Sequence, residues 1–250
     1  MPKRAESLTV RRRRIDDAAR MSDLLRAQIL DGSYGPGALP SESELMLEYA
    51  VGRNVTRDAL DLLRQEGLIE RIQGSGTFVV GTKALHHFDR AHAINDSMPG
   101  PRTVSGAVLS VATTTAPRPV AEQLGLVPGA PCVWLQYLAV VSGVPFSITT
   151  SYVSEDVGHA ISRQVFDGDF YLMLESAGLR IGHSELVVES VAADAPSAAQ
   201  LDVAQGTPLL LFRRRLVGEG GRPLEVGFVR CRGDRLSLRI ELPRTPREPQ

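Results

Sequence analysis

The stretch that decides the fold is LPSESELMLEYAVGRNVTRDALDLLRQEGLIERIQGSGTFVV, residues 39–80. Ser41 stands three residues before Glu44, so its hydroxyl can accept a hydrogen bond from the Glu44 amide while the glutamate side chain reaches back to the Ser41 amide. This capping box predicts the start of a helix. Gly52 then provides a turn residue and an acceptable N-cap for a second helix. Two helices joined by a tight turn are therefore expected.

The second helix is expected to bury one stripe of side chains and to expose its first turns. Its apolar positions follow helical spacing and are Val55, Ala59, Leu62 and Leu63. This arrangement turns four polar side chains toward solvent, namely Arg53, Asn54, Thr56 and Arg57. Arginine pairs with guanine and asparagine with adenine in the major groove of DNA. We therefore take these four side chains as candidates for reading base edges.

A β-hairpin is predicted directly after this helix. Gly67 is placed to end the helix, and residues 68–72 and 77–80 are predicted as two short strands joined by the turn Gln73-Gly74-Ser75-Gly76. A helix-turn-helix followed by a hairpin is a winged helix-turn-helix. Gln73 and Gly74 lie at the tip of the predicted wing, where we expect them to approach DNA.

The run from residue 24 to residue 80 resembles the GntR-type bacterial transcription regulators. The matching residues keep the order and spacing of that family, and they are Ile29, Gly32, Gly37, Leu39, Pro40, Ser41, Glu42, Leu45, Val51, Arg53, Arg57, Ala59, Leu60, Leu63, Glu66, Gly67, Leu68, Ile69, Gly74, Gly76, Thr77, Phe78 and Val79. The resemblance implies a DNA-binding domain in which Ser41 and Ser43 are further DNA contacts. The chain departs from the pattern at Ser43, where many relatives have an arginine, at Ala50, where glycine is usual, and at Gly52, where serine or threonine is usual. These departures concern the half-site sequence and not the binding itself.

Composition sets outer bounds on the class of protein. The chain has 250 residues, enough for two domains with separate cores, and no apolar run approaches the ~18–20 residues that a membrane span needs. Residues 1–80 carry twelve Lys and Arg against twelve Asp and Glu, so affinity for DNA must come from where the charges lie. Cys132 and Cys231 are too far apart for a metal-ligand motif, and no secretory signal is recognisable. We expect a cytoplasmic protein without a cofactor.

Domain boundaries follow from changes in pattern along the chain. Residues 1–16 contain four consecutive arginines, residues 11–14, without apolar periodicity, which predicts a basic flexible arm that lies on DNA or in solvent. The winged helix-turn-helix domain is predicted over residues 17–80, a linker over 81–102, a second domain over 103–243 and a tail over 244–250. The linker contains His86, His87 and His92, but no further ligand stands at metal-binding spacing, so no metal site is predicted.

The second domain is predicted to be an antiparallel sheet with few helices. Strands are expected over residues 104–113, 132–141, 145–153, 184–192, 209–217, 223–231 and 236–242, and short helices near 119–124, 171–177 and 197–201. Two connections have the composition of hairpin turns, residues 142–143 and 218–221. The fold class is therefore α+β. Within residues 213–215 three arginines alternate across a strand, so at most two of them share a face, and a solvated face is favoured over a phosphate clamp.

This second domain resembles the UTRA effector domain, a chorismate-lyase-like module of the HutC subfamily of GntR regulators. The resemblance rests on motifs at residues 131–145, 170–174, 198–210 and 221–235. It implies an effector site at Tyr137, Thr149, Tyr171, Glu225 and Cys231. Relatives that sense sugar phosphates grip the phosphate with two arginines, and this chain has Tyr137 and Ala139 at those positions. Because a buried dianion needs such partners, we expect an uncharged or cationic effector of lower polarity.

Three functions are consistent with these patterns. The first is a homodimeric transcription repressor that binds near-palindromic double-stranded DNA and is released by a small-molecule effector. The second is a regulator whose C-terminal domain only dimerises and binds no ligand. The third is a lyase-like enzyme, although no recognisable catalytic motif is present and no catalytic residue is predicted.

Overall fold

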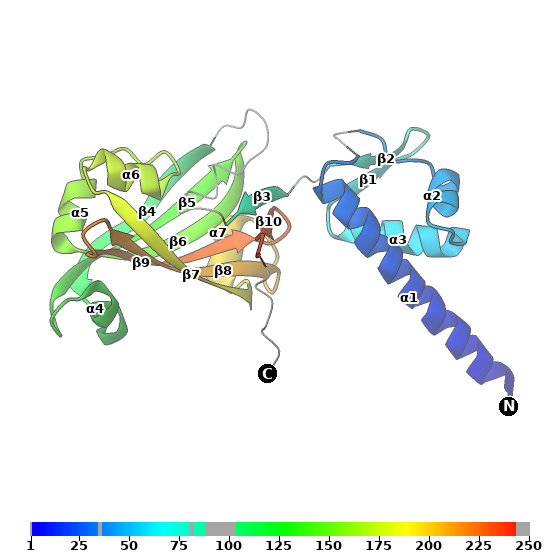
Figure 1. Ribbon diagram of the computed structural model, residues 1–250, viewed down its shortest axis with the longest axis horizontal. Helices are drawn as coiled ribbons and strands as arrows, with labels where there is room; N and C mark the ends of the chain where they lie inside the picture. Colours follow the sequence, from blue (N-terminus) through cyan, green and yellow to red (C-terminus); the bar gives the residue numbers. More distant parts are fainter. Residues whose placement is uncertain (1, 35–36, 81–82, 89–103, 244–250) are drawn as a thin grey trace. The chain divides into compact units, whose positions relative to one another are not determined.

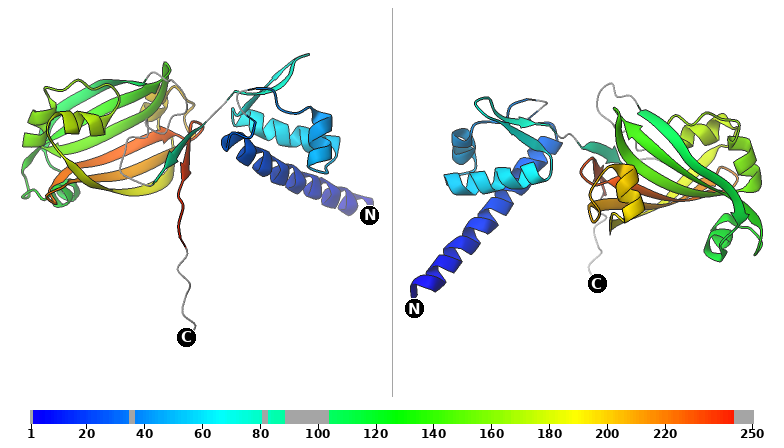
Figure 2. Two further views of the ribbon diagram at one scale, coloured as in Figure 1. Left: turned by 45° about the horizontal axis from the view of Figure 1, so that its top comes forward. Right: turned by 180° about the vertical axis from the view of Figure 1, so that it is seen from behind.

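The computed structural model describes residues 2–34, 37–80, 83–88 and 104–243, with side chains from residue 11 onward. The chain divides between Lys83 and Ala84 into two compact units, called unit 1 and unit 2 below (Figures 1 and 2). Unit 1 comprises α1 (Pro2–Leu30), α2 (Glu42–Glu48), α3 (Arg53–Gln65), β1 (Ile69–Ile72) and β2 (Gly76–Val79). Strands β1 and β2 pair antiparallel, as expected for the wing.

The predicted capping box is present at the start of α2. The Ser41 amide donates to Glu44 Oε2 at 2.7 Å, and the Glu44 amide donates to Ser41 Oγ at 3.3 Å. The core of unit 1 then forms where the three helices and the wing meet, and its buried residues include Met21, Leu25, Leu45, Leu63 and Leu68. After α2 the chain turns through Ala50, which has a left-handed φ of 52°.

The prediction of a flexible arm over residues 1–16 is wrong for the residues that the structure describes. Helix α1 already begins at Pro2. Arginine and alanine favour helices even where no apolar stripe is present, and a salt bridge from Arg14 to Asp58 of α3 ties this part of α1 to unit 1. The region is thus a helical extension of unit 1.

Unit 2 is built on one antiparallel sheet of six strands in the order β4-β5-β6-β9-β8-β7. The strands are β4 (Val104–Thr115), β5 (Pro131–Val141), β6 (Val144–Ser154), β7 (Ile181–Ala192), β8 (Pro208–Gly218) and β9 (Pro223–Arg232). The helices are α4 (Arg118–Leu124), α5 (Glu155–Ile161), α6 (Phe170–Ser176) and α7 (Ala195–Leu201). The α+β class and the antiparallel sheet are confirmed.

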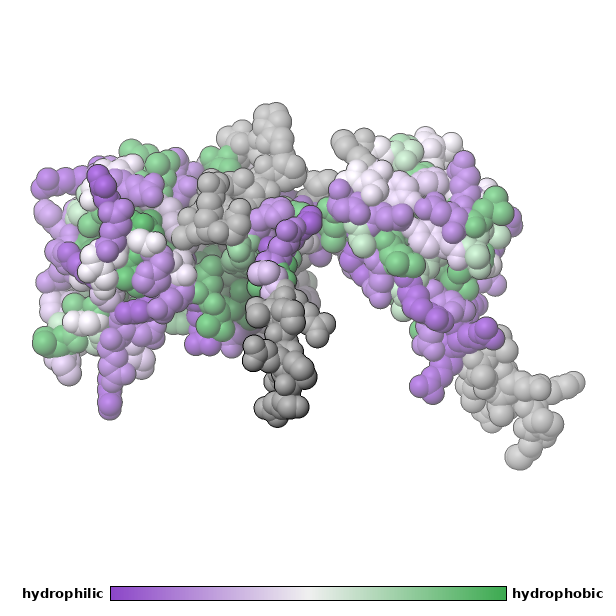
Figure 3. Space-filling model, in the orientation of Figure 1, coloured by the Kyte–Doolittle hydropathy of each residue, from purple (hydrophilic) through white to green (hydrophobic). Residues whose placement is uncertain are grey.

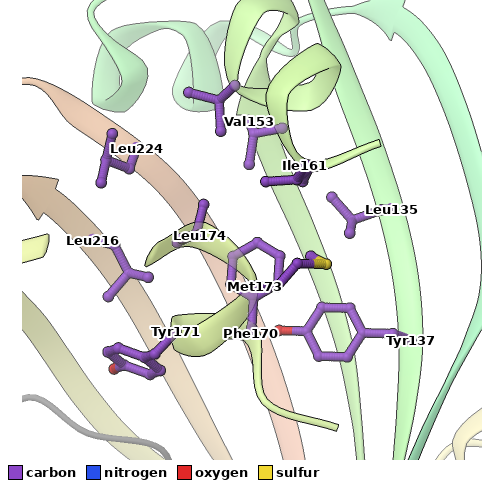
Figure 4. Packing of buried hydrophobic residues seen from close by; sticks show 11 residues of the cluster. Leu135, Tyr137, Val153, Ile161, Phe170, Tyr171, Met173, Leu174, Leu216 and Leu224 are labelled. Carbon is purple, nitrogen blue, oxygen red and sulfur yellow. The ribbon is translucent and has the colours of Figure 1, made fainter. Parts of the chain in front are cut away.

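The helices of unit 2 lie on opposite faces of the sheet. Helices α5 and α6 pack on the face that carries Leu135, Tyr137 and Leu216, and this packing forms the largest cluster of unit 2 (Figures 1 and 4). The opposite face carries Ile148 under α7 and Val226 beside α4. None of the helices in the described residues is long and apolar enough to span a bilayer.

Part of the predicted linker is a strand of unit 2. Strand β3 (Ala84–His87) pairs in parallel with β10 (Leu236–Arg239), and Ala84 and Leu236 are buried beside Phe146 and Cys231. The linker prediction is therefore wrong at β3. Residues 89–103 and the predicted tail, residues 244–250, lie outside the described residues, and so does His92.

Candidate nucleic-acid interface and buried charged cluster

Helix α3 exposes three of the four predicted base-reading side chains. Arg53, Asn54 and Arg57 are exposed, but Thr56 is completely buried, and its hydroxyl donates to the Gly52 carbonyl at 3.3 Å. The buried stripe of α3 is Thr56, Ala59, Leu60 and Leu63, rotated from the predicted one, and Leu62 is partly exposed. Thr56 is therefore a wrong prediction as a base contact, because its side chain faces the core.

The carboxylate of Glu42 joins three elements on this side of unit 1. Arg57 of α3 donates from Nε to Glu42 Oε2 at 3.0 Å, and Arg71 of β1 lies 3.3 Å from Glu42 Oε1. Glu42 itself opens α2. This shared carboxylate fixes the direction of Arg57 while more than half of the arginine side chain stays accessible. Glu42 matches the GntR-like pattern, but the sequence does not single it out as a site residue, because the same residue type is expected in any helical first turn.

The remaining predicted DNA contacts lie at the start of α2 and in the turn between β1 and β2. Ser41 and Ser43 flank Glu42 in the sequence, and their hydroxyls lie 3.2 Å apart. Both are exposed, as are Gln73 and Gly74 in the turn between β1 and β2. Gly74 has a left-handed φ of 80°, and the space where a Cβ would stand is open.

Unit 2 contains a buried ion pair on the face of the sheet that carries α5 and α6. Arg214 of β8 donates to both carboxylate oxygens of Glu225 of β9, each at 2.7 Å, and Ser151 of β6 donates to the same carboxylate. The Glu225 side chain is fully buried and the Arg214 side chain is 10% exposed. A Cβ at Gly227 would stand 2.7 Å from Glu225 Oε1, so the glycine leaves the room that the carboxylate occupies.

Three aromatic rings that are labelled in Figure 4, those of Tyr137, Phe170 and Tyr171, lie next to Arg214. Arg214 also donates to the Tyr137 hydroxyl at 3.0 Å, and its guanidinium carbon lies 5.4 Å from the ring centre of Phe170 and 5.1 Å from that of Tyr171. Burial opposes the charge of Arg214, but Glu225 and the neighbouring tyrosines outweigh it, so the pKa of Arg214 lies well above its ordinary value. Burial raises the pKa of Tyr137 to about 12, which keeps its hydroxyl protonated.

The structure joins three of the five predicted effector residues directly through Arg214. These are Tyr137, Tyr171 and Glu225, while Thr149 lies opposite Tyr137 in the β5–β6 register. Cys231 belongs instead to the cluster around β3 and β10, and burial raises the pKa of its thiol to about 12.

The three arginines at residues 213–215 are divided between the two faces of the sheet, and Arg214 alone of the three lies on the buried face. Arg213 and Arg215 do lie on the other face and pair with exposed Glu189 and Glu185 of β7. Alternation along the strand sends Arg214 to the face that carries Tyr137 and Glu225. Strand alternation predicts this separation of the three arginines, but it does not say which face is buried.

Two of the cavities in the described residues lie beside the aromatic rings of this cluster. A small one of about 30 Å³ is lined by Arg214 and Tyr171 together with His86 of β3, and it has room for about one or two water molecules. A larger, mainly apolar one of about 240 Å³ lies between β4, β5 and α5, with Leu135, Phe166 and Met173 in its wall. The ring of Phe166, in the wall of the larger cavity, packs against Tyr137 at 4.6 Å between centres. Neither cavity has net positive charge beyond the paired Arg214.

Comparison with known proteins assigns both units. Residues 18–79 match the gntR family of bacterial regulatory proteins, and residues 101–237 match the UTRA domain. The chain belongs to the GntR regulators that carry a UTRA domain. It is therefore a DNA-binding transcription regulator with a ligand-binding domain, and the resemblance noted in the sequence is confirmed.

Similar proteins span most of the chain. An HTH-type transcriptional regulator of Mycobacterium tuberculosis is 28% identical over 96% of this chain and 91% of its own length. A histidine utilization repressor of Pseudomonas putida is 29% identical over 79% of this chain and 80% of its own length. The crystal structure of PhnF from Mycobacterium smegmatis, 23% identical, shares the fold with a TM-score of 0.62 over 90% of this chain and 99% of that one. These GntR relatives are regulators, and the enzyme alternative finds no support among them.

Proposed function

We propose that this GntR regulator is a cytoplasmic, homodimeric repressor that binds a near-palindromic operator through α3 and the wing. A small-molecule effector in unit 2 releases it. The observation that carries the DNA-binding part is the exposed first turn of α3, with Arg53, Asn54 and Arg57 beside the Glu42 junction. Repression is supported by relatives named as repressors, including NagR of Bacillus subtilis.

Arg53 is proposed to read a base, because it is the first residue of α3 and the N-terminal end of a reading helix enters the major groove first. Replacing Arg53 by alanine is expected to weaken binding to the operator by about 1–3 kcal/mol and to leave binding to a scrambled duplex nearly unchanged. The operator is first recovered by selection from random duplexes with the full-length protein. An equal decrease on both duplexes would identify Arg53 as a phosphate contact instead.

A homodimer is proposed because one short reading helix contacts too few base pairs for specificity within a genome. Unit 2 offers apolar surface for such contacts on its edge strand β4, where Val108, Leu109 and Val111 are exposed. Sedimentation of the full-length protein at micromolar concentration is expected to show a dimer. A Val111→Lys variant that remained dimeric would place the interface elsewhere, and a monomeric parent protein would contradict the dimer itself.

The effector is proposed to bind near Tyr137 and Tyr171 and to be apolar or amine-bearing. The charge of Arg214 is already balanced by Glu225, whose carboxylate accepts from its Nε and Nη2 groups, so a phosphate dianion would meet no unbalanced positive charge at this arginine. In a mobility-shift assay, glucosamine-6-phosphate and similar sugar phosphates are expected to leave the operator complex intact at millimolar concentration. Release by any of them would refute this part of the proposal. A panel of aromatic and amine metabolites that released nothing would favour a unit 2 that only dimerises.

A further inference from the structure

Helix α1 runs beside α3 in the same direction, and this direction decides where its arginines lie. Arg14 pairs with Asp58 at 2.7 Å, and twelve residues later Arg26 pairs with Glu66 at the end of α3, with Nε to Oε2 at 2.8 Å. The two salt bridges therefore follow the same order along α1 and α3, which shows that the two helices run in the same general direction. Since α1 continues back to Pro2, it crosses α3 at an angle and its N-terminal part projects beyond α3 and away from it, as Figures 1 and 2 show.

Arg11 lies on the side of α1 that faces α3. Residues Arg11, Arg14, Ala18, Met21 and Leu25 follow alternating steps of three and four, which keeps them on one face of a helix. Ala18, Met21 and Leu25 are buried in unit 1, and Arg14 reaches α3. Arg11 stands about 4.5 Å further along the axis than Arg14, at a rise of ~1.5 Å per residue, and so lies level with the first turns of α3.

This position differs from the one occupied by the wing. Arg57 faces Glu42 and the wing strand β1, whereas Asp58 faces α1, and successive residues of a helix lie about 100° apart. The wing and the extension of α1 therefore flank α3 on different sides. Among the side chains that the structure describes, Arg11, Arg12 and Arg13 make no salt bridge, and the surface of this part of α1 is hydrophilic (Figure 3).

We propose that the N-terminal extension of α1 is a second phosphate-binding element, with Arg11 contacting the DNA backbone on the side of α3 away from the wing. This inference rests on the proposed role of α3 as the reading helix. The chemistry is that of a guanidinium beside a phosphodiester, which holds α3 in register and carries no base preference. The wing and the extension then hold the backbone on both sides of the groove that α3 enters.

The test compares two variants with the same charge change, Arg11→Ala and Arg13→Ala. Arg13 lies two residues from Arg11 and hence about 200° around the helix, on the face away from α3. The affinity of the full-length protein for the selected operator and for a scrambled duplex is measured as a function of salt concentration. Arg11→Ala is expected to reduce the slope of log K against log salt by about 0.9 for each phosphate that is no longer neutralised, whereas Arg13→Ala should leave the slope unchanged.

The ratio of the affinity for the operator to the affinity for the scrambled duplex distinguishes a phosphate contact of Arg11 from the proposed reading role of α3. Arg11→Ala should lower the affinity for both duplexes by the same factor, whereas Arg53→Ala should reduce the preference for the operator. An unchanged slope in Arg11→Ala, or an equal reduction in Arg11→Ala and Arg13→Ala, would overturn the proposed contact. If Arg53→Ala kept the full preference for the operator, the reading role of α3 would be overturned. The comparison of salt slopes between Arg11→Ala and Arg13→Ala would remain valid. Arg11→Lys keeps the charge and should keep the slope, and a reduced slope in this variant would also count against a phosphate contact.

Discussion

Replacing Glu225 by glutamine should expose how strongly unit 2 depends on its buried ion pair. The carboxylate accepts two hydrogen bonds from Arg214 and one from Ser151. Glutamine keeps one acceptor oxygen, but its amide group places N–H bonds opposite a guanidinium N–H, and the charge of Arg214 loses its partner. Because neither side chain is more than 10% exposed, solvent does not replace that partner. Removing one member of such a pair costs about 3–5 kcal/mol of unfolding free energy.

The measurement is thermal or urea unfolding of the full-length protein, followed through the transition of unit 2. The expected cost corresponds to a fall in melting temperature of about 6–20 °C for a unit of this size. Glu189→Gln is the matched control. Glu189 of β7 pairs at 2.7 Å with Arg213, which lies next to Arg214 in β8, but both side chains of this pair are about half exposed. The control should cost less than about 1 kcal/mol. Equal costs for the two variants would refute the argument that burial makes the Glu225 pair important.

Three further variants test other local arguments. Ala50→Gly should stabilise unit 1 by about 0.5–1 kcal/mol in thermal unfolding, because Ala50 has a left-handed φ of 52°, and an unchanged stability would contradict this. Gly227→Ala should destabilise unit 2 by about 1–3 kcal/mol, since the added Cβ meets the Glu225 carboxylate at 2.7 Å, and full stability would show that the carboxylate moves freely. Gly74→Glu should weaken binding to operator and scrambled duplexes alike, because it adds a negative charge to the wing tip, and an unchanged affinity would place the wing away from DNA.

The sequence predicted most strands of unit 2 because each is half-buried and alternates in polarity. The capping box of α2 was equally readable, since it depends on two residues at fixed spacing. Thr56 was predicted on the wrong face because its polarity does not match its burial. Its hydroxyl bonds the Gly52 carbonyl within the same helix, so a polar side chain occupies a core position and the apolar spacing alone gives the wrong face.

Long-range pairing explains the other errors. The β3–β10 pair joins segments far apart in the sequence, and a four-residue strand such as Ala84–His87 has too little periodicity to be recognised. The helical extension of α1 carries no apolar stripe before Ala18, so only its tie to Asp58 distinguishes it from a flexible arm. Arg214 was missed as a member of the effector region because the face of a strand that becomes buried is decided by the strands beside it.

The single carboxylate shared by Arg57 and Arg71 also bears on how operator preference evolves in this lineage of regulators. Removal of either arginine leaves the whole carboxylate to the other, so the survivor is held differently from before. A substitution at Arg71 of β1 therefore changes how Arg57 of α3 is held, and a substitution at Arg57 changes how Arg71 is held. New half-site preferences should accordingly arise through paired substitutions at these positions, because the effect of each one depends on the residue at the other.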